Sequence, residues 1–124
     1  MGIMEIGNEL VKGCREGREM ENLDRLYAAD AVSVEAADMQ GMGREAPGLE
    51  AIRGKHQWWE SNFEVIEPRV EGPYPHGEDR FAVMFGGKFR NKESGEISDM
   101  NEIAVYHVKN DKIVREEFFY PTEA

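Results

Sequence analysis

The first third of the chain alternates between helical and extended patterns of apolar residues. Residues 3 to about 16 are predicted to form an amphipathic helix, because apolar side chains recur there at spacings of three, four and four. A shorter helix is predicted over about 20–28. The run 31–37 alternates apolar and polar residues, which predicts a strand or a short extended entry into the following loop. The apolar positions of the first helix are Ile3, Ile6, Leu10 and Cys14.

A glycine-rich loop follows over 38–48, and it is long enough to take part in function. Pro47 then opens a third predicted helix, over about 47–61, in the first-turn position that proline favours. Apolar side chains recur along one face of this helix at spacings of three, four, three and four, so His56 projects among apolar neighbours. That face consists of Leu49, Ile52, His56, Trp59 and Phe63.

Two strands are predicted next. Residues 64–72 contain Pro68, which predicts a strand at a sheet edge or one interrupted by a bulge. The run 80–90 alternates strongly, and its central Gly86-Gly87 pair predicts a bend or a bulge.

The segment 98–120 is typical of a β-hairpin that places acidic residues among apolar ones. Two alternating runs, 102–108 and 113–120, flank the turn residues Asn110 and Asp111. A strand with carboxylates among isoleucine, valine and aromatic residues either has a solvated face or lines a pocket.

The order of elements is helix, helix, strand, helix, and then about four antiparallel strands. Helices followed by a meander indicate an α+β fold, with the helices packed on one face of a curved antiparallel sheet. Such an arrangement forms a cone, whose open mouth is a natural pocket.

The length of the chain limits the number of domains, and its net charge limits the kinds of partner that it can bind. The chain has 124 residues, enough for one domain, and 25 acidic against 15 basic residues give a net charge of −10. This balance argues against binding to nucleic acid or to anionic membranes. The single cysteine, Cys14, excludes an intrachain disulfide. Without a signal-like start or an apolar run of membrane-spanning length, we expect a cytoplasmic protein.

Four segments, spread in order over nearly the whole chain, carry a resemblance to a known family: LDRLYAADAVSVEA, GLEAIRGKHQWW, GPYPHGEDRFAVMF and MNEIAVYHVKNDKIVREEFFY. Together they resemble the NTF2-like superfamily, in particular its SnoaL-like branch. The resemblance implies a single SnoaL-like domain over 1–124, a cone-shaped α+β barrel on about three N-terminal helices, and an internal apolar cavity. It also implies a homodimer formed through the outer sheet face. The superfamily includes ketosteroid isomerases, polyketide cyclases, epoxide hydrolases, dehydratases and non-enzymes.

One catalytic residue can be transferred through this resemblance. Ketosteroid isomerases have a catalytic aspartate shortly after a Tyr-Ala-x-Asp-Ala segment, which matches 27–31 here and places Glu35 at the aspartate's position. The oxyanion donors of those enzymes do not carry over, because their positions fall near Val11 and near Ala104 or Val105.

Glu35 is therefore a candidate general base with a pKa raised by apolar surroundings. Alternation leaves another arrangement open. If Val32 and Val34 face the cavity, Glu35 faces outward and Asp38 takes its place. A solvated glutamate at a strand end is the third interpretation.

Glu102 and Glu116 are the other two candidate catalytic acids, and the hairpin register decides what they share a face with. A two-residue turn places Val105 opposite Glu116, and a three-residue turn places Ala104 there. The first register groups Glu116 with Asn101, Ile103 and His107. The second groups it with Glu102, Tyr106 and Tyr120. Two acids in one apolar cavity would differ in pKa and supply an acid and a base, whereas acids on a solvated face would pair with Lys112 and Arg115.

We expect a cofactor-free enzyme acting on a small hydrophobic molecule with an activated carbon–hydrogen bond or an epoxide. The alternative is a non-catalytic module for ligand binding or dimerisation. No metal site is expected, because the three histidines show no metal-binding spacing. Candidate substrate-binding residues are His56, Trp59, Phe85, Tyr106, Phe118 and Tyr120.

Overall fold

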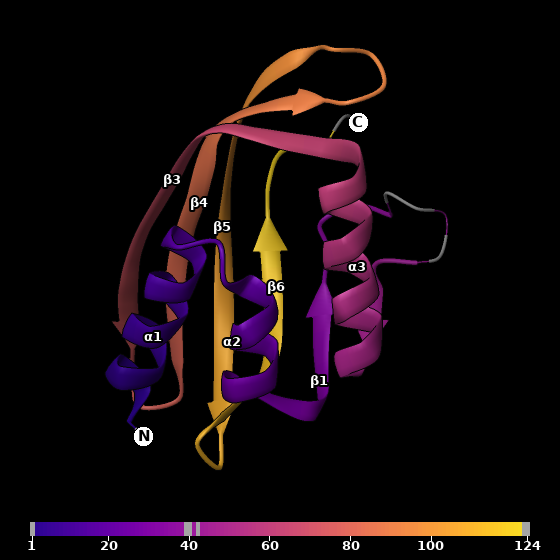
Figure 1. The fold of residues 1–124 in the computed structure, drawn as a ribbon. Helices are drawn as coiled ribbons and strands as arrows, with labels where there is room; N and C mark the ends of the chain where they lie inside the picture. Colours follow the sequence, from indigo (N-terminus) through magenta and orange to yellow (C-terminus); the bar gives the residue numbers. More distant parts are fainter. Residues whose placement is uncertain (1, 39–40, 42, 123–124) are drawn as a thin grey trace.

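The computed structural model describes residues 2–38, 41 and 43–122, in which three helices cover one face of a curved six-stranded sheet (Figure 1). The strands lie in the order β2-β1-β6-β5-β4-β3. The elements are α1 (Ile3–Arg15), α2 (Glu19–Leu26), β1 (Tyr27–Val34), β2 (Glu45–Pro47), α3 (Leu49–Asn62), β3 (Phe63–His76), β4 (Arg80–Asn91), β5 (Ile97–Lys109) and β6 (Lys112–Phe119).

The α+β class is as predicted, and two details of the sheet differ. The sheet is mixed rather than antiparallel, because β1 and β6 run parallel to each other. After β1 the chain passes through β2, α3 and the β3–β5 meander before β6 pairs with β1. The sheet is also open: β2 and β3 stand at its two ends, so the cone is not a closed barrel.

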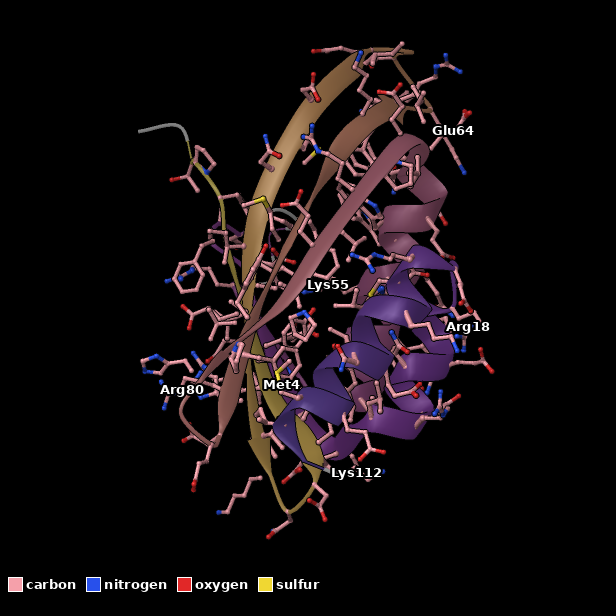
Figure 2. All side chains as sticks on the ribbon, turned by 90° about the vertical axis from the view of Figure 1, so that its left-hand side faces the viewer. Met4, Arg18, Lys55, Glu64, Arg80 and Lys112 are labelled. Carbon is pink, nitrogen blue, oxygen red and sulfur yellow. The ribbon has the colours of Figure 1, made fainter. Side chains whose placement is uncertain are left out.

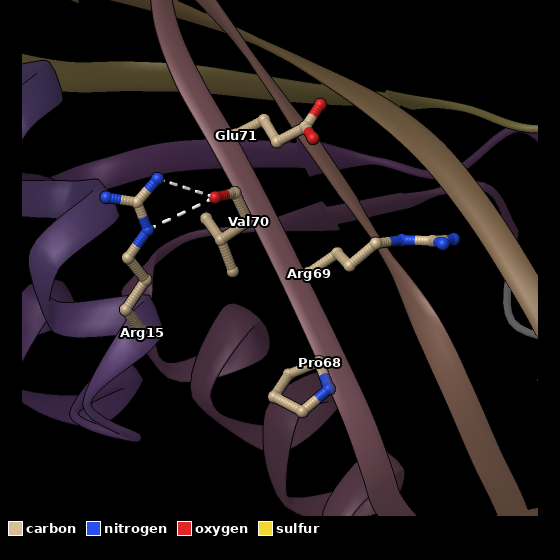
Figure 3. A pocket seen from close by; sticks show the side chains of 5 residues that line it. All are labelled: Arg15, Pro68, Arg69, Val70 and Glu71. Atoms are coloured by element: carbon tan, nitrogen blue, oxygen red, sulfur yellow. Dashed lines mark hydrogen bonds between the residues drawn. The ribbon is translucent and has the colours of Figure 1, made fainter.

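The core lies between the helices and the concave face of the sheet. Since α1 and α2 bury one apolar stripe each, they close over the inward side chains of β4, β5 and β6. Arg15 at the end of α1 ties this helix to β3, donating from Nη2 and Nε to the Val70 carbonyl at 2.7 and 3.1 Å (Figure 3). Core side chains with no more than 1% exposure include Ile6, Leu10, Leu23, Ile52, Phe81, Val83 and Ile113.

Strand β3 is both an edge strand and a bulged one, as Pro68 predicts. Its pairing with β4 shifts between Val65 and Glu67. Opposite Pro68, Gly87 has a φ of +127°, and a Cβ there would lie 1.7 Å from the Glu67 carbonyl oxygen. Only glycine permits this close approach, so the Gly86-Gly87 pair marks the irregularity predicted for it.

The hairpin register corrects both alternatives drawn from the sequence. The turn has two residues, and Asn110 and Asp111 have φ values of 52° and 63°, as a type I′ turn requires. Val114 is then an extra residue in β6, so Glu116 lies opposite Tyr106 rather than Val105 or Ala104. The bulge turns Glu116 to the face that carries Tyr106, although the turn is the shorter one.

Two element boundaries also differ. The second helix ends at Leu26 and β1 begins directly at Tyr27, so 27–34 rather than 31–37 forms the strand. Pro47 lies in the short strand β2, paired with Val32, instead of in the first helical turn. No helix among the described residues has the length and apolar character needed to cross a membrane.

Candidate functional site

A cavity of about 1330 Å³ lies between α3, the end of β1 and the concave face of the sheet. All nine residues singled out from the sequence line it, although they come from five different parts of the chain. They are Glu35, His56, Trp59, Phe85, Glu102, Tyr106, Glu116, Phe118 and Tyr120.

Lys55 of α3 is a site residue that the sequence analysis missed. It lies three residues after the fully buried Ile52 and four before Trp59, so it shares their helical face. In Figure 2 it lies between the sheet and the helices, whereas Arg18 and Arg80 lie at the periphery. The spacing alone could have identified it, but charged residues on a helix are usually assigned to the solvated face.

The Lys55 ammonium joins two of the predicted acids. Its Nζ lies 2.7 Å from Glu35 Oε1 and 3.7 Å from Glu116 Oε2, and it donates to Ser33 Oγ. The same nitrogen lies 4.4 Å from the centre of the Phe118 ring, in a cation–π contact. The ion pairs are largely shielded from solvent, since the Lys55 side chain is 16% exposed and that of Glu35 is 21% exposed.

Glu116 is the most deeply buried acid of the site, at 1% exposure. Tyr27 donates its hydroxyl hydrogen to Oε1, and Ser33 Oγ donates to Oε2 at 2.7 Å. Both donors come from β1, where Ser33 pairs directly with Glu116 across the parallel ladder. Every oxygen of this carboxylate therefore has a donor, as burial of a charge demands. Tyr27 and Ser33 were not identified from the sequence, because only the unanticipated β1–β6 pairing brings them to Glu116.

Glu102, in contrast to Glu116, has no hydrogen-bond donor among the described residues. It projects from β5 opposite Phe85, half-buried, and within the described residues it forms no hydrogen bond or ion pair. Burial raises the pKa of Glu102 to about 7, and the negative charge of Glu35 adds to the effect, while Lys55 opposes it. This carboxyl group can therefore gain or lose a proton near neutral pH.

Of the orientations considered from the sequence, Glu35 adopts the one in which its side chain faces the cavity. Ser33 and Glu35 share a side of the chain and both contact Lys55. Arg44 holds the backbone here, with Nε donating to the Glu35 carbonyl at 2.9 Å. Asp38, the alternative base, is exposed.

Two tyrosines complete the polar part of the cavity. Tyr106 is 2% exposed, and burial, followed by the charge of Glu116, raises its pKa well above the usual value. Burial also raises the pKa of Tyr120 to about 12, with the Glu35 charge as the next cause. The Tyr120 oxygen accepts from the Ala37 amide at 3.4 Å. Both hydroxyls stay protonated and can donate.

The walls are mainly aromatic. Trp59 stacks on Phe63, with ring centres 4.2 Å apart, and meets Phe89 edge-on at 5.6 Å. His56 and Phe85 line the same space. In the part of the chain that the structure describes, no group of three His, Cys, Asp or Glu side chains is arranged to hold a metal ion.

Comparison with known proteins gives one family and many structural neighbours. The SnoaL-like domain family model matches residues 1–120. A crystal structure from Mesorhizobium loti, assigned as a SnoaL-like polyketide cyclase, is 38% identical with a TM-score of 0.88, covering 97% of this chain and 100% of that one. The search among curated proteins found no match.

Two more distant structures share the fold. An NTF2-like protein from Burkholderia thailandensis has a TM-score of 0.82 at 13% identity, covering 98% of this chain and 92% of its own. A protein from Bacillus subtilis, assigned as an isomerase, has a TM-score of 0.74 at 17% identity, covering 98% and 90%.

Proposed function

Since this chain belongs to the SnoaL-like domain family, we propose that it binds a small, mostly hydrophobic molecule in its cavity and transforms it by acid–base catalysis without a cofactor. The reaction class is that of isomerases and cyclases, in which a proton leaves an activated carbon and another is delivered nearby. The neighbour from Mesorhizobium loti carries the name polyketide cyclase, together with carbohydrate phosphatase, and the neighbour from Bacillus subtilis carries the name isomerase.

The observation that carries the proposal is the environment of Glu102. A carboxyl group with a pKa of about 7 is matched to proton transfer near neutral pH, because half of it is available as acid and half as base. It lies in an aromatic cavity and has no described partner to compete with a substrate. We therefore assign the proton transfer to Glu102.

Glu35 and Glu116 take different parts in this proposal. The Glu35–Lys55 pair supplies a second carboxylate and a nearby cation, and together they can stabilise charge that develops on the substrate. Glu116, with both oxygens accepting hydrogen bonds, positions Lys55. Tyr120 and His56 orient the substrate, and Phe85, Trp59 and Phe118 pack against its apolar body.

Base-promoted ring opening of 5-nitro-1,2-benzisoxazole tests the proton transfer without knowledge of the natural substrate. A carboxylate in an apolar cavity removes the carbon-bound proton of this probe, the nitrogen–oxygen bond breaks, and a coloured phenolate forms. We expect Glu102→Gln to lower the rate by about 10²–10⁴ and Glu35→Gln to lower it less. Glu117→Gln, which removes a charge from the other side of β6, should leave the rate unchanged.

The two variants also separate the alternatives. A larger loss in Glu35→Gln than in Glu102→Gln would return the role of base to Glu35. Undiminished rates in both variants would reject acid–base catalysis by these residues.

A second candidate function is a non-catalytic module that binds a ligand or assembles with a second copy. One observation favours assembly: Met84, Ile103 and Phe119 lie side by side across β4, β5 and β6 on the convex face, with 38%, 44% and 49% exposure. We propose that this apolar row is the centre of a homodimer interface. Sedimentation velocity should show a dimer that Ile103→Glu converts to a monomer, and a wild-type monomer at high concentration would reject it.

A further inference from the structure

The interior of the cavity has an unbalanced charge. Among the described lining residues, four carboxyl groups are not exposed, and the Lys55 ammonium is the one cation that is not exposed. The four acids are Glu19, Glu35, Glu102 and Glu116. Lys55 is committed to Glu35 at 2.7 Å and to Glu116 at 3.7 Å. With those two ionised, one negative charge is left over, and ionisation of Glu102 would add a second.

Arginines at the rim do not supply the missing cation. Arg15 donates to the Val70 carbonyl, Arg44 to the Glu35 carbonyl and Arg69 to Asn101 Oδ1 at 2.8 Å. All three are exposed, so their charge is screened by solvent. A ligand carboxylate inside the cavity would thus face carboxylates without a free cationic donor, which is an arrangement that rejects anions.

The walls around Glu102 suit a cation instead. Tyr106 and Phe118 face the same cavity from β5 and β6, and Phe85 lies directly opposite Glu102. Aromatic faces attract cations, and the Lys55 ammonium already lies 4.4 Å from the centre of the Phe118 ring. A carboxyl group without a partner among aromatic rings is the arrangement that recognises an organic ammonium group.

We propose that the cavity takes a ligand with a protonated amine on an apolar, ring-containing body, and that Glu102 is the counter-ion of that amine. The ammonium lies between Glu102 and the aromatic walls, and the apolar body fills the space between Trp59 and Phe85. The occupant is organic rather than a metal ion, because the described side chains provide no triad of metal ligands. The inference rests on the proposed function, because both need a ligand in this cavity. The two roles of Glu102 agree, since a neighbouring ammonium keeps the carboxyl group ionised, which is the form that accepts a proton.

A matched set of probes tests the selectivity. Isothermal titration calorimetry at pH 8 would compare 2-naphthylmethylamine, 2-naphthylmethanol and 2-naphthoate, which share one ring system and differ in charge. We expect the amine to bind at least about tenfold more tightly than the alcohol and more tightly still than the carboxylate. Glu102→Gln should lower the affinity for the amine by about tenfold and change that for the alcohol less than about twofold.

The control is Glu117→Gln, which removes the same charge from a residue paired with Arg115 outside the cavity, and it should leave all three affinities unchanged. Equal binding of amine and alcohol, tighter binding of the carboxylate, or an amine preference that survives in Glu102→Gln would overturn the inference while leaving a ligand cavity in place. Failure of all three probes to bind would reject both the inference and the ligand-binding part of the proposed function.

Discussion

Two regions of one cavity use the same residue type in opposite ways. Around Glu116, at 1% exposure, both carboxylate oxygens receive donors from β1 and the Lys55 ammonium lies 3.7 Å away. Around Glu102, on the neighbouring strand, the side chain is half-buried and has no described partner. Hydrogen-bond donors fix the Glu116 side chain in the fold, whereas burial without donors raises the pKa of Glu102 and produces a group that can exchange protons.

The largest effect on stability is expected from replacing Glu116, and it tests the structural role assigned to this residue. We expect Glu116→Ala to lower the free energy of unfolding by about 3–5 kcal/mol, because Lys55, Tyr27 and Ser33 lose their shared acceptor. Urea unfolding at pH 7 measures this. The neighbouring Glu117→Ala, on the other side of β6, should cost less than about 1 kcal/mol. Similar losses in the two variants would show that the Glu116 network is not a structural centre.

A smaller effect of the opposite sign is expected at Glu102. Its pKa rises from 4.5 to about 7 on folding. Between these two pH values, Glu102 therefore binds a proton more tightly in the folded protein than in the unfolded chain. The contribution of Glu102 to stability is fully present below pH 4.5 and is lost as the pH rises through 7, a change of about 3 kcal/mol.

Glu102→Gln tests that linkage, because glutamine cannot ionise. The variant should be about as stable as the wild type at pH 4.5 and more stable at pH 8 by about 3 kcal/mol. Urea unfolding of both proteins across this range gives the difference directly. A constant difference between the two proteins at all pH values would mean that Glu102 titrates normally in the folded state.

Periodicity predicted the fold and the aromatic part of the cavity well. The spacing of Leu49, Ile52, His56 and Trp59 identified the inner face of α3, and the resemblance around Tyr27–Ala31 identified Glu35 as a cavity residue. The prediction for α3 succeeded because it depends on a local repeat of 3.6 residues, which neighbouring segments do not alter. Glu35 was placed by the resemblance alone, because alternation left its direction open.

The polar network of Glu116, Ser33 and Lys55 could not be predicted from the sequence, for three physical reasons. The extra residue at Val114 changes which side of β6 Glu116 occupies, and a bulge has no reliable sequence signal. Ser33 meets Glu116 only through the parallel pairing of β1 with β6, which joins segments more than eighty residues apart. Lys55 has the spacing of a buried residue but the charge of a surface one, and only its acidic partners explain its position.

The titration of Glu102 in the folded protein is the most direct test of this difference between the two regions. Carbon NMR of protein labelled at the glutamate side-chain carboxyl groups, with the resonance assigned by its loss in Glu102→Gln, follows this group alone. We predict a midpoint at about pH 7. A midpoint near the ordinary value of 4.5 would contradict the account, because Glu102 would then be a solvated carboxylate with no special capacity for proton transfer.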